Sequence, residues 1–501
     1  MSALATDTAG TAPREEARPG LLERLGDRLN PLVVKEVRQG VRSRVFWVSF
    51  GLMLLACFIL SLVAYVSTRD GGSSIRGQGF FFGFFVCLGM VHFFIIPYSA
   101  YRSLARERED ETWVLLILTG LGPRRILRGK VASFLVQAGL YASAVGPFLL
   151  FSYYLNGIDL PTILVVLGLG ASWLLFLTVV AVCAATLADG RMGRALVHLV
   201  LLGTLGLSLM YGLMAAFFLS EQGYRSIARD DEFLAGTCGF LWAMLTYGWL
   251  LFETAAARLS LSTENYTWGP RLALTLQLML SGVLLLALWL TEDPSTGAAE
   301  AVSVLGCLHL ALTGIFVATD VDGQARALRA GTRPWSLLRP GAVRGFRLVV
   351  LLLLFWTGWC AGLFFLSEER FSASSPHLLS VLAVPAYAIL FLSLPLVVGR
   401  LPRSDRLASP AVVRVLFFAL VGLAGALPPL LAVLFDQSMD DPLFNLLNPF
   451  IGVENFSDYD YSLDEPEMDP GLLAFVWGVA ALVAFVADRA LVARERRAHA
   501  S

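Results

Sequence analysis

Twelve long apolar stretches constrain the fold of this 501-residue chain more than any other feature. A helix that crosses the ~30 Å hydrocarbon layer needs about 20 mainly apolar residues, because each backbone N–H and C=O must be satisfied within the segment. The sequence therefore predicts an all-α polytopic membrane protein and excludes a soluble enzyme. We expect the spans near residues 46–66, 79–100, 131–155, 162–188, 195–220, 234–256, 271–291, 301–318, 346–366, 378–398, 411–435 and 471–492.

Lys and Arg in the connections predict the orientation of the spans. Basic residues near span ends are retained on the cytoplasmic side. With twelve spans, one side carries 33 of the 38 Lys and Arg residues and the other carries five. The sequence thus predicts that both termini are cytoplasmic, and it favours the bacterial cytoplasmic (inner) membrane. We expect no removable signal peptide, because no short apolar core with a cleavage site precedes the first span.

The polar composition argues against several other classes of protein. A formal net charge of −1 gives no basic field for nucleic acid. All six cysteines fall inside apolar runs without metal-ligand spacing, and no Ser/His/Asp or His-rich set suggests a membrane enzyme. We expect no catalytic residues, metal or cofactor.

Residues 30–45, NPLVVKEVRQGVRSRV, predict an amphipathic helix before the first span. Asn30 suits the cap position and Pro31 the first helical position. Valines at 34, 37, 41 and 45 recur at helical spacing. The opposite face suits a helix at the membrane surface that meets anionic headgroups, and it carries Lys35, Glu36, Arg38, Gln39 and Arg42. A merely basic flank to the first span is the alternative.

Residues 105–130, ARERED ETWVLLILTGLGPRRILRGK, predict a short independent helix between the second and third spans. Residues 107–111 form an acidic first part, residues 113–118 form about two apolar turns, and Gly120, Gly122 and Pro123 end the helix. Such a short helix is marginal alone in water. We expect it to dock on the bilayer or on a cytoplasmic protein.

The run from Glu107 to Lys130 resembles the signature of the type 2 ABC exporter permeases, and residues 30–44 are similar to their N-terminal interface helix. The resemblance covers about residues 28–270. It departs from the pattern at Glu111 and Gly120. The resemblance implies that residues of this run couple to an ATPase. They either match the signature or belong to the same short helix, and they are Glu107, Arg108, Glu109, Thr112, Trp113, Leu115, Leu116, Thr119, Gly129 and Lys130.

The resemblance implies a permease subunit of an ATP-driven exporter. Its short helix would sit in a groove of a separate ATP-binding subunit, and the permease would act as a homodimer or heterodimer. ATP would be handled by that other chain, because Gly129-Lys130 lacks the earlier Gly and the following Ser or Thr of a phosphate loop.

Two rival functions remain open at this stage. Residues 187–194, LADGRMGR, resemble a cytoplasmic motif of major-facilitator carriers, which are ion-coupled secondary transporters. Such a carrier would need buried ionisable groups within its spans, and the sequence offers few. A non-transporting membrane scaffold is the other alternative. The transported substrate is not indicated.

Three regions are expected along the chain. A flexible cytoplasmic N-terminus, residues 1–29, precedes a six-span permease domain at 30–270. A second six-span bundle follows at 271–501, either as a degenerate repeat of the first or as an accessory bundle. It carries an external loop, 436–470, with ten acidic and no basic residues. This loop is either a solvated cap, or a gate or docking surface for a partner outside the cell membrane.

Overall fold

The computed structural model describes residues 31–69, 77–110, 112–113, 121–155, 158–188, 190–227, 229–261, 264–291, 296–321, 335–367, 375–397, 409–439, 441–460, 465–466 and 468–500. Within these residues twelve helices are long and apolar enough to cross a membrane. The predicted fold class, an all-α protein of about twelve spans, is therefore confirmed. The chain divides into two compact units between Leu245 and Thr246, inside one of these helices. The expected domain boundary lies instead between residues 270 and 271.

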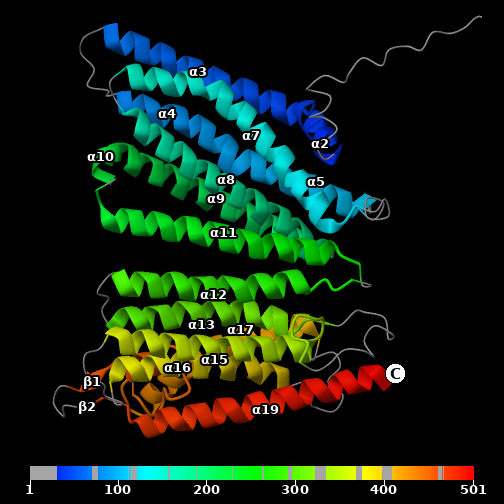
Figure 1. Ribbon diagram of the computed structural model, residues 1–501, viewed down its shortest axis with the longest axis vertical. Coiled ribbons are helices and arrows are strands. Elements are labelled where there is room, and N and C mark those ends of the chain that lie inside the picture. The colour runs from blue at the N-terminus through cyan, green and yellow to red at the C-terminus, as the bar shows by residue number, and fades with distance from the viewer. Residues whose placement is uncertain are drawn as a thin grey trace, which may run out of the picture. The chain divides into compact units, whose positions relative to one another are not determined.

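The first unit begins with a short helix, α2, that precedes the spans (Figure 1). The second span is the centre of this unit, because it packs against the third, fourth and fifth spans. The helices are α2 (Pro31–Val41), α3 (Arg44–Arg69), α4 (Gly77–Gly89), η1 (Met90–Ile95), α5 (Ile96–Glu109), α7 (Pro123–Tyr154), α8 (Leu160–Leu187), α9 (Arg191–Gln222), α10 (Tyr224–Ile227) and α11 (Asp231–Leu259).

The second span is one continuous helix made of α4, η1 and α5. Its middle segment, η1, is π-helical and lies just before Pro97, which has no N–H to donate to the preceding turn. The 32 residues from Gln78 to Glu109 form one helix, which at about 1.5 Å per residue is roughly 48 Å long. This length exceeds the ~30 Å hydrocarbon layer, so the end of α5 must project beyond it.

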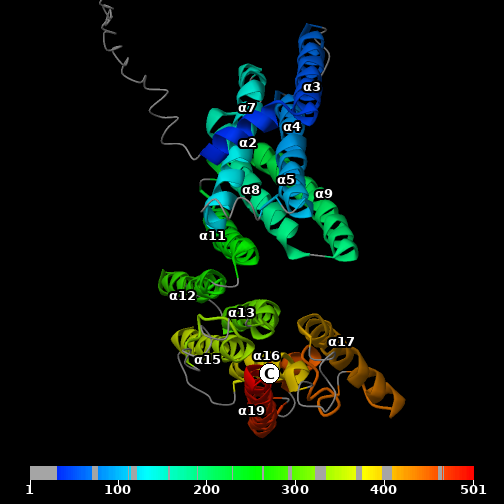
Figure 2. The same cartoon turned by 90° about the vertical axis from the view of Figure 1, so that its right-hand side faces the viewer.

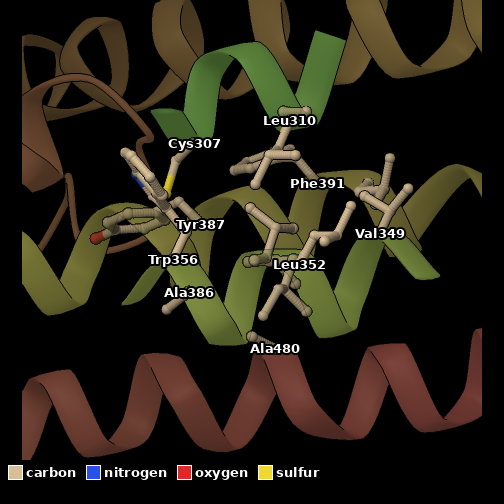
Figure 3. Close-up of a cluster of buried hydrophobic side chains, with 14 of the residues drawn as sticks. Cys307, Leu310, Val349, Leu352, Trp356, Ala386, Tyr387, Phe391 and Ala480 are labelled. Carbon is tan, nitrogen blue, oxygen red and sulfur yellow. The ribbon is translucent and has the colours of Figure 1, made fainter. Parts of the chain in front are cut away.

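The second unit holds a large apolar core around α16 (Figure 3). Leu310 of α13, Leu352 of α15, Phe391 of α16 and Ala480 of α19 meet there. Its elements are α12 (Trp268–Thr291), α13 (Thr296–Ala318), α15 (Ala342–Ser367), α16 (Pro376–Val397), α17 (Pro410–Leu434), α18 (Ile451–Ser457), β1 (Tyr459–Asp460), β2 (Glu465–Pro466) and α19 (Pro470–Ala500), together with the C-terminal part of α11.

Glycines let α13 and α15 approach closely. A Cβ on Gly345 would lie 2.0 Å from the carbonyl oxygen of Val317, and one on Gly314 would lie 2.5 Å from Val349. Side chains larger than hydrogen are therefore incompatible with this spacing. Small residues serve the same purpose in other membrane bundles, where close backbone approach replaces the hydrophobic drive that lipid cannot supply.

The acidic segment between α17 and α19 is partly folded onto its own unit. Within it, α18 packs against α16, and a two-stranded antiparallel ladder pairs Tyr459 with Pro466. Phe456 is buried, and Tyr387 of α16 donates a hydrogen bond to the carbonyl oxygen of Leu446. The described part of this segment is thus more than a solvated loop. Its role as a docking surface stays a prediction.

Candidate functional site

A fully buried lysine joins three segments at one end of the first unit. Lys130, in α7, donates from Nζ to Glu107 Oε1 at 2.8 Å and to Ser103 Oγ at 3.0 Å, both on α5. It also donates to Oε1 of Glu36 on α2 at 3.3 Å. The segment before the first span, the end of the second span and the start of the third span are therefore joined by one ammonium group.

Local sequence explains how these groups meet. Ser103 and Glu107 are four residues apart, so they lie on one face of α5. Gly122 precedes α7 and Pro123 occupies its first turn, so Lys130 falls in the second turn. Gly40 brings α2 close to α7, because a Cβ there would lie 2.4 Å from Gln137 Nε2.

This cluster has the chemistry of a structural ion-pair network that joins helices, not that of a catalytic site. An ammonium group has three protons to donate, and Lys130 has three oxygen acceptors, so its hydrogen-bonding capacity is used. A buried charge is tolerated only when it is paired and hydrogen-bonded. The cluster therefore holds both ends of the 110–122 connection at fixed positions.

The other described residues that are expected to couple to an ATPase lie near the Lys130 cluster. Arg108 Nη1 donates to the carbonyl oxygens of Ala185 at 2.9 Å and Ala188 at 3.5 Å, which ties α5 to the end of α8. Glu109 lies 4.0 Å from Arg194 of α9. Thr112 is exposed, Trp113 is half-buried, and the backbone of both is helical; Gly129 is buried. Leu115, Leu116 and Thr119 lie outside the described residues.

The expectation that residues 107–111 begin a separate helix is wrong for its first three residues. Glu107, Arg108 and Glu109 instead form the last turn of α5, continuous with the second span. Carboxylates at a helix C-terminus oppose the helix dipole. Arg106 and Arg108 in the same turn, and Lys130 across from it, offset that cost.

The expected exposed polar face of the N-terminal helix is also corrected. Lys35 and Arg38 are exposed, as a headgroup-facing surface requires, but Glu36 is buried against Lys130. Val34, expected on the apolar face, is exposed. The cause is the close packing of α2 on α7, along the edge of α2 that holds Glu36 and Gly40. Figure 2 shows α2 beside α7. Asn30 lies outside the described residues, and Pro31 is the first residue of α2.

Sequence reasoning missed a second buried cation, Arg271, in the second unit. Its guanidinium group donates to the carbonyl oxygens of Leu337, Arg339 and Gly341 at 2.7, 2.5 and 3.2 Å. It also pairs with Asp320 at 3.0 Å. Arg271 lies near the start of α12, Asp320 follows α13, and the carbonyls precede α15. One sequence feature could have predicted this buried cation, namely that Arg271 lies in the first turn of a predicted span.

The described residues contain no cluster of His, Cys, Asp and Glu able to hold a metal ion. One carboxylate lies within a span beside a histidine. Glu300 of α13 accepts from Ser380 Oγ at 2.6 Å and lies 3.2 Å from His377 Nδ1, both on α16. All three are near the ends of their helices, so they form a local contact and not a chain of groups across the span.

Comparisons with known proteins give no family assignment. No protein-family model, no curated protein and no solved structure matches this chain.

Proposed function

We propose that this chain is the permease subunit of an ATP-driven ABC exporter of the type 2 class. Residues 105–130 would couple it to a separate ATP-binding subunit. Both termini would lie in the cytoplasm of a bacterial cell, and permeases would pair as homodimers or heterodimers. The twelve apolar helices support the multi-pass membrane architecture that such a permease requires.

The observation that carries the proposal is the Lys130 cluster. A connection that transmits force must be held rigidly where it leaves the membrane, or the force is lost in local bending. Both ends of the 110–122 connection meet at Lys130, which also joins α2. A push on this connection would therefore move the second and third spans and α2 together. ATP-driven closure of a partner could use such an element to switch the spans between two states.

Among the residues of the connection that the structure describes, Trp113 is the aromatic side chain able to contact the partner. It belongs to the connection itself and is only half-buried. Burying a large apolar side chain contributes roughly 1.5 to 3 kcal/mol. The charged residues beside it would orient the partner more than they would add affinity.

Purification of the full-length chain from its own cells, after mild cross-linking, tests the proposal. We expect a nucleotide-hydrolysing protein to co-purify with the wild type and to be lost from Trp113→Asp. Phe435→Asp is the matched control, because Phe435 is also an aromatic residue in a connection between two spans and is exposed. Twelve alternating spans would put it on the opposite side of the membrane. Equal recovery of that protein with both variants would reject the coupling role.

An ion-coupled carrier is the second candidate, and the Glu300–His377 contact is the observation in its favour. A carrier would work in sealed vesicles that contain the purified chain alone, driven by a proton or sodium gradient, and Glu300→Gln would stop it. An exporter subunit would need its partner and ATP. A non-transporting scaffold would move no substrate under either condition.

A further inference from the structure

A basic cavity lies between α5 and α9, apart from the Lys130 cluster. Its volume is about 370 Å³, toward the lower end of the ~300–1,000 Å³ range of ligand sites. Arg102, Arg106 and Glu109 line it from α5. Arg191, Arg194 and His198 line it from α9.

Helical spacing explains why these groups converge. Residues 102, 106 and 109 are separated by four and three positions, and so are residues 198, 194 and 191, which places each set on one face of its helix. His198 lies against Tyr101 and Tyr98 of α5, with ring centroids 5.5 and 5.6 Å apart. These aromatic contacts hold the two faces together at the inner end of the cavity.

The cavity carries an excess of positive charge. Arginine keeps its proton in proteins, so four guanidinium groups face one carboxylate, Glu109. Only Arg194 approaches that carboxylate, at 4.0 Å. Arg102, Arg106 and Arg191 form no ion pair within the described part of the chain. The N-terminus of α9 adds to the positive potential, since Gly190 provides no side-chain cap.

The position of the cavity favours one kind of anion. Its residues occupy the last turns of one apolar span and the first turns of another, which places them near the level of lipid headgroups. Leu199 is exposed on the flank of α9 next to His198, where an acyl chain would lie. Basic pockets between membrane helices bind anionic headgroups, and the guanidinium fork fits phosphate oxygens.

We propose that this cavity is a binding site for a phosphate group, supplied by an anionic phospholipid headgroup or by a soluble phosphate. Arg102, Arg106 and Arg191, which form no ion pair with the described residues, provide the donors, and Arg194 shares its charge with Glu109. The site is independent of the proposed coupling to an ATPase.

The test uses the full-length chain in neutral detergent after lipid removal. Short-chain phosphatidylglycerol is titrated and bound lipid is counted by native mass spectrometry. Phosphatidylcholine is the zwitterionic control, because its choline cation neutralises its own phosphate. The pocket variant is Arg102→Gln/Arg191→Gln. The matched control is Arg496→Gln/Arg497→Gln, which removes two exposed arginines from the end of α19.

We expect phosphatidylglycerol to bind the wild type and the control at least tenfold more tightly than it binds the pocket variant. Phosphatidylcholine should not compete. A second arm titrates inorganic phosphate alone. If the wild type binds phosphatidylglycerol but not inorganic phosphate, the site is a lipid site. If it binds inorganic phosphate but not the lipid, and the pocket variant loses that binding, the ligand is a soluble phosphate.

Two results would overturn the proposal. One is equal affinity of the pocket variant and the control for phosphatidylglycerol and for phosphate. The other is no saturable binding of either probe by the wild type. Arg102→Lys/Arg191→Lys serves if the glutamine variant misfolds. It keeps the charge but loses the fork, so its affinity should lie between the wild type and the glutamine variant, and wild-type affinity would count against the proposal.

Discussion

Lys130 Nζ lies 2.8 Å from Glu107 Oε1, and the lysine side chain is fully buried. Removing one partner of a buried ion pair typically costs about 3 to 5 kcal/mol, because the other charge stays buried without compensation. We expect Lys130→Met to lower the stability of the first unit by about that amount. Thermal unfolding in detergent would measure it.

Arg128→Met is the control for this change. Arg128 is exposed, lies two residues away on α7, and forms no ion pair with the described residues. If both variants unfold at the same temperature, Lys130 does not join the three segments in the way its contacts indicate.

The approach of α2 to α7 gives a second prediction. Gly40→Leu should weaken this contact by about 1 to 3 kcal/mol, because the new side chain overlaps Gln137. Gln137→Ala should recover part of the loss, so the two changes should not be additive. The unfolding midpoints of the two single variants and the double variant would show this coupling. Gly139→Leu is the control, because open space surrounds a Cβ at that position.

The number and approximate bounds of the spans could be predicted from sequence, because long apolar runs have few alternatives in a membrane. The end of the second span could not. Residues 101–109 are polar enough to suggest a loop, yet they continue α5, because the helix projects beyond the hydrocarbon layer and remains packed against α8. Hydropathy marks where a helix leaves the membrane, not where it stops.

The Lys130 cluster could be predicted only in part. The sequence predicts Glu107 and Lys130 as coupling residues of one segment and Glu36 as part of the N-terminal helix, but no pattern predicts that the three side chains meet. Their meeting depends on the packing of α2 on α7, which Gly40 permits. Arg271 was not selected, because its acceptors are mainly backbone carbonyls and leave no pattern in the side chains.

Each unit has a buried cation that joins the ends of neighbouring spans. In the first unit, Lys130 joins the segment before the first span to the end of the second and the start of the third. In the second unit, Arg271 joins the start of the seventh span to the end of the eighth and the chain before the ninth. The second and eighth spans each pack against the next two spans of their unit. The two cations belong to different spans of their units, Lys130 to the third and Arg271 to the first. A degenerate repeat and an accessory bundle therefore both stay predictions.

Arg271 gives the third prediction. Arg271→Met would leave three carbonyl oxygens and Asp320 without their donor, and each lost partner of a buried acceptor costs about 1 to 3 kcal/mol. We expect severe loss of folded protein, measured by size-exclusion chromatography after solubilisation. Arg271→Lys should recover only part of it, since a lysine lacks the planar fork. Full recovery with lysine would mean that the charge alone matters, and Arg496→Met controls for the loss of an exposed arginine.

The contact between α13 and α15 gives the fourth prediction, at Gly345. A Cβ at this position would lie 2.0 Å from the carbonyl oxygen of Val317, which belongs to the backbone of a packed helix and cannot rotate away. Gly345→Ala must therefore push the two helices apart and open the core of the second unit. We expect a loss of about 1 to 3 kcal/mol, the usual cost of overpacking.

Gly358→Ala on the same helix separates this steric effect from helix propensity. A Cβ at Gly358 meets no atom within 4 Å, so alanine there should be neutral or should stabilise the helix by up to about 1 kcal/mol. The difference between the two unfolding midpoints measures the steric cost directly. Alanine favours a helix at both positions. If Gly345→Ala raised the unfolding midpoint as much as Gly358→Ala does, α13 and α15 would have to lie farther apart than the contact at Gly345 indicates.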